Sequence, residues 1–244
     1  MPERLDVMVF DSGRARSRSQ AAELIRAGRV SVNGRTITKP GHRVSGAEVI
    51  AVQPDPWVSR AAHKLLGALD QSGLEVPPRV LDAGASTGGF TQVLLGRGAQ
   101  VVYAVDVGHD QLAPTIRADA RVRVREGLNL RELTLADLDD QPVDLVVADV
   151  SFISLRLLLR PLFSVLSVEG VALLMIKPQF EVGRGGLGAG GVVRSDQDRT
   201  QAIEAVIAEA AELGWQPKWR GDSVLPGPAG NLEHFVCLKP ATAG

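Results

Sequence analysis

Residues 82–91 read DAGASTGGFT, and the elements on either side of this stretch define the architecture of most of the chain. The short apolar run at residues 79–81 predicts a strand before it, and residues 90–95 predict a helix after it. A strand, a glycine-rich turn and a helix in this order open a nucleotide-binding α/β unit. The glycines let the backbone come close to a ligand, and the helix presents its first amides to that ligand.

The spacing of the glycines indicates which class of nucleotide ligand the turn suits. Ser86 occupies the position at which a dinucleotide-binding fingerprint has its second glycine, and the Gly-Lys-Ser/Thr of a phosphate-binding P-loop is absent. The pattern D-x-G-x-x-x-G-G instead favours S-adenosylmethionine, whose amino-acid end lies against such a turn. The alternative is a turn without a ligand. The candidate cofactor-binding residues in the turn are Asp82, Gly84, Ser86, Thr87, Gly88, Gly89 and Phe90.

Composition excludes several classes of protein. The 244 residues are 45% hydrophobic and 23% charged, as expected for one or two globular domains. A single cysteine excludes an internal disulfide and a multi-cysteine zinc site, and four scattered histidines show no metal-ligand spacing. We therefore expect no metal. The chain shows no N-terminal signal and no apolar run of membrane-spanning length, which predicts a cytoplasmic protein without membrane association.

Charge is distributed unevenly, although the net charge is only −1. Residues 1–52 contain nine Lys and Arg against five Asp and Glu, whereas the remaining residues contain 18 against 23. A small basic segment joined to a mildly acidic body predicts a polyanion-binding module on a separate core domain. Residues 53–58 predict a stiff linker between the two, because the prolines at 54 and 56 restrict the backbone. The core domain is then residues 59–244, and it opens with a predicted amphipathic helix from Ser59 to about Gln71, for which Ser59 is a candidate N-cap.

The basic segment has a readable order of elements. Residues 5–10 have helical spacing, and a second helix is predicted over residues 20–27 with Ser19 as its N-cap. Residues 30–37 predict a hairpin on an Asn-Gly turn, and residues 44–52 predict a further strand. The result is a small α+β domain.

This domain resembles the S-four type RNA-binding domain, named for a ribosomal protein, in residues 5–6, 17–21, 24–25, 28–30, 32–34 and 39–40. The resemblance implies that one helix face and the basic loop lie on RNA, through contacts that weaken with salt. The alternative is a solvated basic face without a partner. The residues implied to contact RNA are Arg14, Arg16, Arg18, Arg26, Arg29 and Lys39.

Apolar runs alternate with helical stretches after the glycine turn. Strands are predicted over residues 100–106, 122–125, 143–149, 170–176, 215–222 and 231–238. A helix from Ser151 or Ser154 to about residue 166 and another over residues 197–213 lie between them. Such continuous runs predict a parallel sheet covered on both faces. Two strands after the last helix fit a Rossmann-like sheet of seven strands whose final strand is antiparallel.

Polar side chains follow these strands at the edge where ligands of α/β sheets bind. Asp106, directly after an apolar strand, is expected to accept hydrogen bonds from ribose hydroxyls, and Asn129 is a candidate contact for adenine. Asp149 and Lys177 end the next two strands, and Asp149 is also a candidate cofactor contact. Residues 182–191 contain six glycines, which suit either a mobile lid or a plain surface loop.

Taken together, these motifs resemble the TlyA family of ribosomal RNA 2′-O-methyltransferases, members of which are also labelled haemolysins. The body is also similar to the FtsJ-like branch of S-adenosylmethionine-dependent methyltransferases. The likeness covers nearly the whole chain, and it implies transfer of a methyl group to cytidine ribose in ribosomal RNA within ribosomal subunits. The matching stretches of the body are residues 58–60, 63–65, 82–91, 149–155, 176–181 and 230–233.

The resemblance also implies a catalytic set, which falls on Lys64, Asp149, Lys177 and Glu233. A ribose hydroxyl is a poor nucleophile while it keeps its proton, and a lysine can take that proton only if its pKa is lowered. We assign hydroxyl activation to Lys177, as base or as steering group, with Asp149 holding it beside the sulfonium. For each residue alone, the alternative is a structural ion pair.

Three other functions compete with this interpretation. A base methyltransferase would carry Asn/Asp-Pro-Pro-aromatic after the fourth strand, whereas residues 149–152 read DVSF. A membrane-active haemolysin would need an apolar span or a strongly amphipathic cationic segment, and the sequence has neither. A non-catalytic RNA-binding or ribosome-assembly factor has no need of the intact catalytic set.

Overall fold

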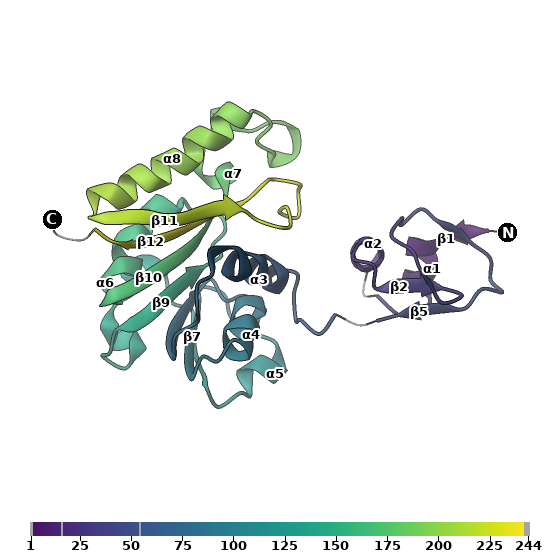
Figure 1. The fold of residues 1–244 in the computed structure, drawn as a ribbon, viewed down its shortest axis with the longest axis horizontal. Helices are drawn as coiled ribbons and strands as arrows, with labels where there is room; N and C mark the ends of the chain where they lie inside the picture. The colour runs from purple at the N-terminus through teal and green to yellow at the C-terminus, as the bar shows by residue number, and fades with distance from the viewer. Residues whose placement is uncertain (1, 16, 54, 242–244) are drawn as a thin grey trace. The chain divides into compact units, whose positions relative to one another are not determined.

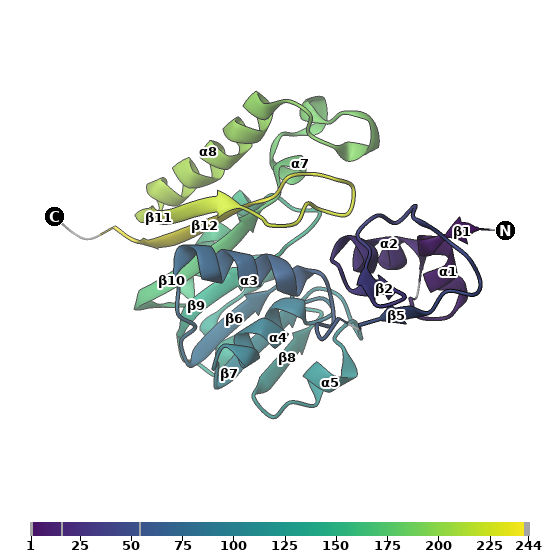
Figure 2. The ribbon, with the colours of Figure 1, turned by 45° about the vertical axis from the view of Figure 1, so that its right-hand side comes forward.

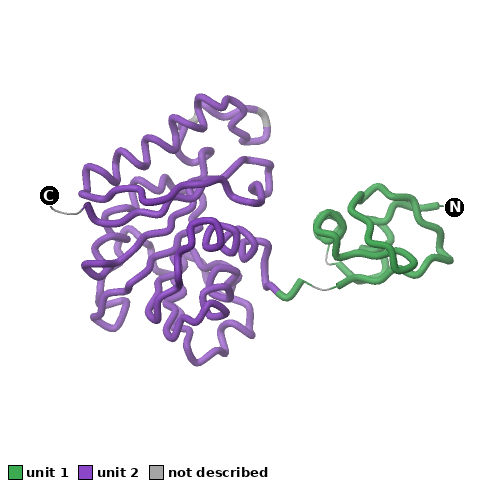
Figure 3. The backbone as a smooth tube through the Cα atoms, viewed as in Figure 1, with its two compact units in different colours: residues 1–56 green, residues 57–244 purple. Residues whose placement is uncertain are grey.

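A computed structural model describes residues 2–15, 17–53 and 55–241, which divide into two compact units, residues 1–56 and 57–244 (Figure 3). Each unit has its own buried core. The first unit is small and mixed, and the second is built on a seven-stranded sheet. Within the described ranges, every helix is too short or too polar to cross a bilayer.

Two helices pack on short strands in the first unit (Figure 1). The helices are α1 (Leu5–Asp11) and α2 (Arg18–Arg26), and Leu5, Val9 and Ile25 bury their side chains between them and the strands. One sheet pairs β1 (Glu3–Arg4) with β4 (Arg43–Val44), and the other has the order β3 (Arg35–Thr36), β2 (Val30–Val32), β5 (Ile50–Val52). The expected α+β arrangement of this unit is therefore confirmed.

The first unit follows the sequence in its hairpin and departs from it in a helix cap. Asn33 and Gly34 join β2 to β3 with φ of 49° and 77°, the left-handed conformation that an Asn-Gly hairpin turn requires. The predicted cap Ser19 is wrong, because α2 begins two residues earlier than expected and Ser17 Oγ accepts the Gln20 N–H at 3.1 Å. The predicted strand over residues 44–52 is two short strands, β4 and β5.

The second unit is organised by a twisted sheet of order β11-β12-β10-β9-β6-β7-β8 (Figure 1). Neighbouring strands from β10 to β8 are parallel, and β12 is antiparallel to both β10 and β11. This is the predicted sheet with its antiparallel strand. The strand bounds are β6 (Arg79–Ala83), β7 (Val101–Asp106), β8 (Val122–Glu126), β9 (Val143–Ala148), β10 (Leu166–Ile176), β11 (Trp215–Asp222) and β12 (His234–Pro240).

Helices cover both faces of this sheet, as continuous apolar strands require. One buried cluster joins the sheet to α3 (Ala61–Ser72), α4 (Gly89–Gly96) and α5 (Pro114–Arg117), and Figure 2 shows α3 and α4 over that face. The opposite cluster joins it to α6 (Leu159–Ser164) and α8 (Asp196–Glu212). The remaining short helical elements are η1 (Leu130–Glu132), η2 (Leu135–Leu138), η3 (Leu155–Leu157), α7 (Pro178–Glu181), η4 (Arg184–Gly186) and η5 (Ala189–Gly191).

Two predicted helix caps in this unit are replaced by other contacts. Helix α3 starts at Ala61 with Arg60 as N-cap, so Ser59, which has the form of a cap, lies one residue too early. The helix expected from Ser151 or Ser154 is split into η3 and α6, and Ser154 occupies the N-cap position of η3 without a capping hydrogen bond from its side chain. Instead, the Leu155 N–H donates to Glu181 Oε1 at 2.7 Å, from a residue 26 positions later in the chain.

Candidate active site

Strand alternation brings three of the four predicted catalytic residues to one face of the sheet. Successive side chains of a strand point to opposite faces, so a residue two positions beyond a buried one shares its face. Val147, Met175 and Phe235 all belong to the cluster under α3 and α4. Asp149, Lys177 and Glu233 each lie two positions from one of them. Because Ile176 pairs with His234, the backbones of Lys177 and Glu233 continue the same register across β10 and β12.

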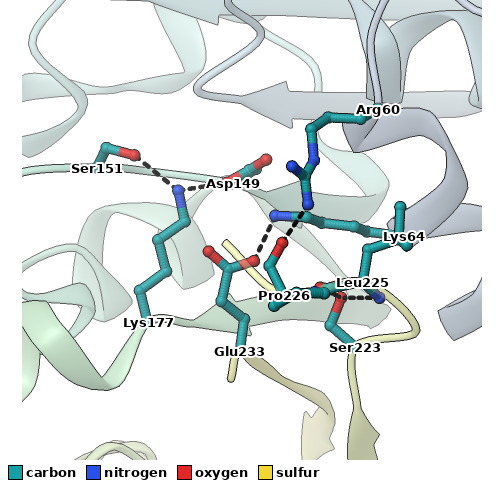
Figure 4. Close-up of polar contacts among 9 residues, drawn as sticks. All are labelled: Arg60, Lys64, Asp149, Ser151, Lys177, Ser223, Leu225, Pro226 and Glu233. Atoms are coloured by element: carbon teal, nitrogen blue, oxygen red, sulfur yellow. Dashed lines mark hydrogen bonds and ion pairs between the residues drawn. The ribbon is translucent and has the colours of Figure 1, made fainter. Parts of the chain in front are cut away.

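Lys177 and Asp149 form an ion pair at the ends of β10 and β9. Lys177 Nζ lies 2.6 Å from Asp149 Oδ1, and it donates a hydrogen bond of 2.6 Å to Ser151 Oγ (Figure 4). The two charged side chains are 11% and 16% exposed, so the pair is mostly buried yet still reached by solvent. Only the contact with Ser151 is a hydrogen bond, so the lysine can still donate to another group.

Lys64 and Glu233 form a second, fully enclosed ion pair. Lys64 projects from α3 and meets the carboxylate of Glu233, which lies immediately before β12 (Figure 4). Their side chains are only 5% and 1% exposed. Beside them, Arg60 donates to the main-chain carbonyl of Pro226. These contacts tie α3 to the segment between β11 and β12.

The glycine-rich turn is folded tightly against neighbouring strand ends. Gly84 has φ of 86°, and a Cβ there would come within 2.8 Å of the Asp149 carbonyl oxygen. Ser86 also adopts a left-handed conformation, with φ of 47°, and its N–H donates to Asp106 Oδ2 at 2.8 Å. The Gly108 N–H donates to the other oxygen of Asp106 at 2.8 Å. The turn therefore fixes the Asp106 carboxylate, and other lone pairs on it can accept further hydrogen bonds.

A cavity lies between this turn, the start of α3 and the Lys177–Asp149 pair. Asp149, Ser151 and Lys177 form one side. Facing them are Ser59, Arg60, Ala61, Gly84, Ala85, Ser86, Thr87, Gly89 and Phe90. Ser59 Oγ is buried and has no hydrogen-bond partner in the described part of the chain. A partly enclosed cavity at the carboxyl ends of parallel strands is where α/β folds bind ligands.

Asp82 lies behind the turn rather than in the cavity wall. Its side chain is fully buried, and Oδ2 accepts a hydrogen bond of 2.6 Å from Thr91 Oγ1. Burial raises the pKa of Asp82 from 3.8 to about 7, and the nearby negative charges of Asp149 and Asp106 add to the increase. Asp82 thus supports the turn from inside the sheet.

The remaining predicted cofactor residues are divided between the cavity and its surroundings. Gly88 is buried under Leu112 and Ile116, with φ of 92°, and shapes the turn without lining the cavity. Asn129 lies outside the cavity, and its Oδ1 accepts the Arg131 N–H at 3.1 Å. Within the described ranges, no group of three or more His, Cys, Asp or Glu is placed to hold a metal ion.

The predicted RNA-contacting residues lie in the first unit and are mostly exposed. Arg29 is half-buried and lies 3.6 Å from Asp55, while Arg18 lies 3.6 Å from the buried carboxylate of Asp6. Arg16 lies outside the described residues. The exposed members of the set are Arg14, Arg18, Arg26 and Lys39.

Four residues near the cavity were missed by the sequence analysis. Ser59 and Ser151 line it. Phe152 is 92% exposed and lies at a ring-centroid distance of 5.4 Å from Phe180. Asn231 is buried, with Oδ1 accepting the Val193 N–H at 2.9 Å and Nδ2 donating to the Gly191 carbonyl at 3.0 Å. All four lie in the stretches that carried the family resemblance. That resemblance was the signal from which they could have been predicted.

A seven-stranded mixed sheet with one antiparallel strand, a glycine turn after its first strand and polar strand ends define the methyltransferase class. Residues 57–240 match the FtsJ-like methyltransferase family, and residues 3–50 match the S4 domain. The chain belongs to the TlyA family of ribosomal RNA 2′-O-methyltransferases, which joins these two domains.

Several family members are similar over almost their full length. The chain is 49% identical over 243 residues to the 16S/23S rRNA (cytidine-2′-O)-methyltransferase TlyA of Mycobacterium tuberculosis, covering 98% of this chain and 90% of that protein. It is 39% identical to Hemolysin A of Brachyspira hyodysenteriae, covering 96% and 99%. A solved structure of a putative hemolysin from Streptococcus thermophilus is 37% identical, with a TM-score of 0.76 over 99% and 90% of the chains.

Proposed function

We propose that this protein transfers a methyl group from S-adenosylmethionine to the ribose 2′-oxygen of cytidine in ribosomal RNA. The observation that carries the proposal is the ion pair of Lys177 with Asp149, which faces a cavity beside a methyltransferase glycine turn. The 49% identity to a protein named as a 16S/23S rRNA (cytidine-2′-O)-methyltransferase supports the choice of substrate. The S4 match in the first unit supports an RNA partner, within ribosomal subunits.

The cavity residues fit S-adenosylmethionine. The unpartnered, buried Ser59 hydroxyl and the first amides of α4 suit the carboxylate of its amino-acid end. The Asp106 carboxylate, oriented by Ser86 and Gly108, suits the ribose hydroxyls. Asp149, at the wall of the cavity, suits a positively charged sulfur. When bound, the cofactor supplies a methyl group on a sulfonium, which is already activated for in-line displacement.

Lys177 is assigned to the acceptor oxygen. Its hydrogen bond to Ser151 and its ion pair with Asp149 leave Nζ able to contact the ribose 2′-oxygen and steer it toward the methyl group. As the oxygen bonds to the methyl carbon and the carbon–sulfur bond breaks, the hydroxyl proton would pass to Lys177 in its amine form, or to solvent if Lys177 is an ammonium. In either form Lys177 orients the acceptor oxygen, and we assign it this steering role. Orientation of two reactants can lower a barrier by about 7–11 kcal/mol, which makes this role sufficient for a large rate effect.

Lys64 and Glu233, the other two residues of the proposed set, are given a supporting role. Their pair is too enclosed to meet a ribose, with side chains 5% and 1% exposed. It fixes α3, whose first turn carries the cavity wall at Ala61, against the strand next to Lys177. We assign these two residues to holding the site together.

An exposed aromatic pair suits the nucleotide that carries the acceptor. Phe152 follows Ser151 by one residue and packs against Phe180, which itself lies in α7 directly after Lys177. Single-stranded or splayed-out bases stack on such side chains, at about 1–3 kcal/mol per base. We assign Phe152 to stacking with a base beside the reacting ribose.

The proposal is tested with labelled S-adenosylmethionine and ribosomal subunits from a strain that lacks the enzyme. We expect label in ribosomal RNA, recovered after digestion as 2′-O-methylcytidine. Label on a base, or the absence of label on both subunits and on their precursors, would contradict the proposal. Removal of residues 1–52 should abolish labelling, because these residues would supply the contacts with RNA phosphates. The second unit should stay folded, because it has its own core.

The hemolysin names among the relatives motivate a second test. Such names belong to proteins that cover nearly all of this chain, including one that is 39% identical. Vesicles loaded with a self-quenched dye should stay intact on addition of the purified protein at the concentrations that give full methylation. Dye release at those concentrations would favour the membrane-active alternative.

A further inference from the structure

Glu181 is a buried acid that the proposed mechanism does not use. Its side chain is 1% exposed and lies at the end of α7, four residues after Lys177. Its Oε2 accepts the Ser154 hydroxyl at 2.6 Å, its Oε1 accepts the Leu155 N–H at 2.7 Å, and Arg156 Nε lies 3.4 Å from Oε2. A buried carboxylate with this many donors is fixed in place and fixes its donors in turn.

These contacts join the ends of two neighbouring strands. Ser154 and Leu155 follow β9 and Asp149, whereas Glu181 follows β10 and Lys177. The segment 150–155 is therefore held at one end by β9 and at the other by the carboxylate of Glu181. The Asp149 N–H, bonded to the Ala83 carbonyl at 3.1 Å, fixes the first end.

Two side chains of the proposed acceptor site lie within this short segment. Ser151 accepts the hydrogen bond from Lys177 Nζ, and Phe152 packs against Phe180. Phe152 also has φ of 66°, a conformation that a bulky residue adopts only where its surroundings hold it. Since the Phe152 side chain is 92% exposed, packing of its own ring supplies little of that restraint. The restraint therefore comes from the rest of the segment, where Val150 and Ile153 pack in the core and Glu181 holds the far end.

We propose that Glu181 is a positioning residue, which fixes segment 150–155 against the end of β10 and thereby sets Ser151 and Phe152 for the acceptor nucleotide. This inference rests on the proposed function for its effect on methylation, whereas the restraint itself concerns only the fold of the second unit. A purely structural role, capping η3 at Leu155, would instead affect stability and every ligand alike.

The test uses Glu181→Gln in the full chain. The amide keeps the volume but offers one acceptor oxygen in place of two, so the Ser154 hydroxyl or the Leu155 N–H loses its partner. Amide hydrogen exchange is measured over residues 150–157, with Glu209→Gln on the exposed face of α8 as the control that has the same charge change. Ser154→Ala is the second variant, because it removes one hydrogen bond and leaves Glu181 charged.

We expect exchange over residues 150–157 to become about 10-fold faster or more in Glu181→Gln, with a smaller increase in Ser154→Ala and none in Glu209→Gln. With ribosomal subunits as substrate, kcat should fall about 10²-fold while the Kd for S-adenosylmethionine and the Tm change little, because misplacement by about 1 Å is enough for such a loss. Added to Phe152→Leu, Glu181→Gln should cost less than it does alone, since both act on one segment.

Unchanged exchange in Glu181→Gln would overturn the inference whether or not the protein methylates RNA. Faster exchange together with unchanged kcat, or an equal loss of Tm, cofactor binding and kcat, would overturn the positioning role and leave only a helix cap. A wild-type protein that does not label RNA would contradict the proposed function, and the exchange data would still decide whether Glu181 restrains the segment.

Discussion

Two Lys–carboxylate pairs in the second unit use the same chemical groups in different surroundings. Lys64 and Glu233 are enclosed, with side chains 5% and 1% exposed, whereas Lys177 and Asp149 are 11% and 16% exposed and line a cavity. A buried pair has lost its hydration on both sides, so removal of one partner leaves an unpaired charge in the protein interior. A pair at a cavity wall can exchange one partner for a ligand. We therefore expect the Lys64–Glu233 pair to contribute mainly to stability and the Lys177–Asp149 pair to contribute mainly to catalysis.

The largest effect is expected for Lys177→Ala. Loss of the group that orients the acceptor oxygen should lower kcat by about 10²-fold or more, since misplacement by about 1 Å is enough for such a loss. The Kd for S-adenosylmethionine and the Tm should change little, because the cavity residues that suit the cofactor remain. The measurement is label transfer to ribosomal subunits beside a thermal melt, with Lys218→Ala on the exposed face of β11 as the control.

The enclosed pair should respond in stability. Lys64→Ala and Glu233→Ala are each expected to lower the free energy of unfolding by about 3–5 kcal/mol, because the remaining charge stays buried. The double variant Lys64→Met with Glu233→Leu should recover most of that loss, since an apolar pair of similar volume needs no hydration. Urea titration of the single and double variants measures both effects.

The control for this experiment is Arg220→Ala, which removes a salt bridge with Glu204 whose side chains are 54% and 52% exposed. Such an exposed pair contributes only about 0–1 kcal/mol. If Lys64→Ala were no more harmful than Arg220→Ala, the enclosed pair would have no special role in stability.

Strand positions of this site could be predicted from the sequence, and the contacts between them could not. Asp149 and Lys177 end apolar runs, so their place at one sheet edge follows from parallel topology. Their face follows from alternation, because Val147 and Met175 are buried under α3. That Lys64 meets Glu233 depends on a chain separation of 169 residues, and no local pattern encodes it.

The structure changes three predicted helix caps. Ser19 and Ser59 have the form of caps, but a cap is decided by where the backbone enters the helix, and Ser17 and Arg60 take those positions. Ser154 does occupy an N-cap position, yet the acceptor for the Leu155 N–H is Glu181, from a distant segment. The complete burial of Asp82 at the end of a central strand could likewise not be read from its place after an apolar run.

A third, smaller effect concerns pH and the inner support of the turn. The folded carboxyl of Asp82 keeps its proton up to a pH of about 7, whereas its ordinary pKa is 3.8. The folded state therefore binds more protons than the unfolded state between these values, and stability declines as the pH rises through that window. Relative to Asp82→Asn, the wild type should lose roughly 2 kcal/mol between about pH 5 and about pH 7.

Asp119→Asn is the opposite case, because hydrogen bonds from Arg121 lower the pKa of Asp119 to about 2. That variant should be less stable than the wild type at neutral pH, and the difference should disappear in acid, as the wild-type carboxylate takes up a proton between about pH 4 and about pH 2. Chemical denaturation across the pH range measures both variants. A constant difference between Asp82→Asn and the wild type would show that Asp82 is ionised in the folded state.

The smallest effect is expected in the first unit, because RNA binding there would be the sum of several phosphate contacts and each residue contributes only one of them. Arg26→Ala should weaken binding to ribosomal RNA about equally for different sequences and reduce the slope of log Kd against log salt by about 1. Arg97→Ala in the second unit, which breaks a surface pair with Asp70, is the matched control. Equal slopes of log Kd against log salt for the two variants would contradict a contact between Arg26 and an RNA phosphate.

The division between the two ion pairs is tested most directly by measuring kcat on ribosomal subunits and the free energy of unfolding for Lys177→Ala and Lys64→Ala side by side. We expect Lys177→Ala to lose rate at nearly unchanged stability, and Lys64→Ala to lose stability well beyond any loss shown by Lys177→Ala. A Lys177→Ala protein that methylates RNA at the wild-type rate, or one that unfolds as readily as Lys64→Ala, would contradict this account.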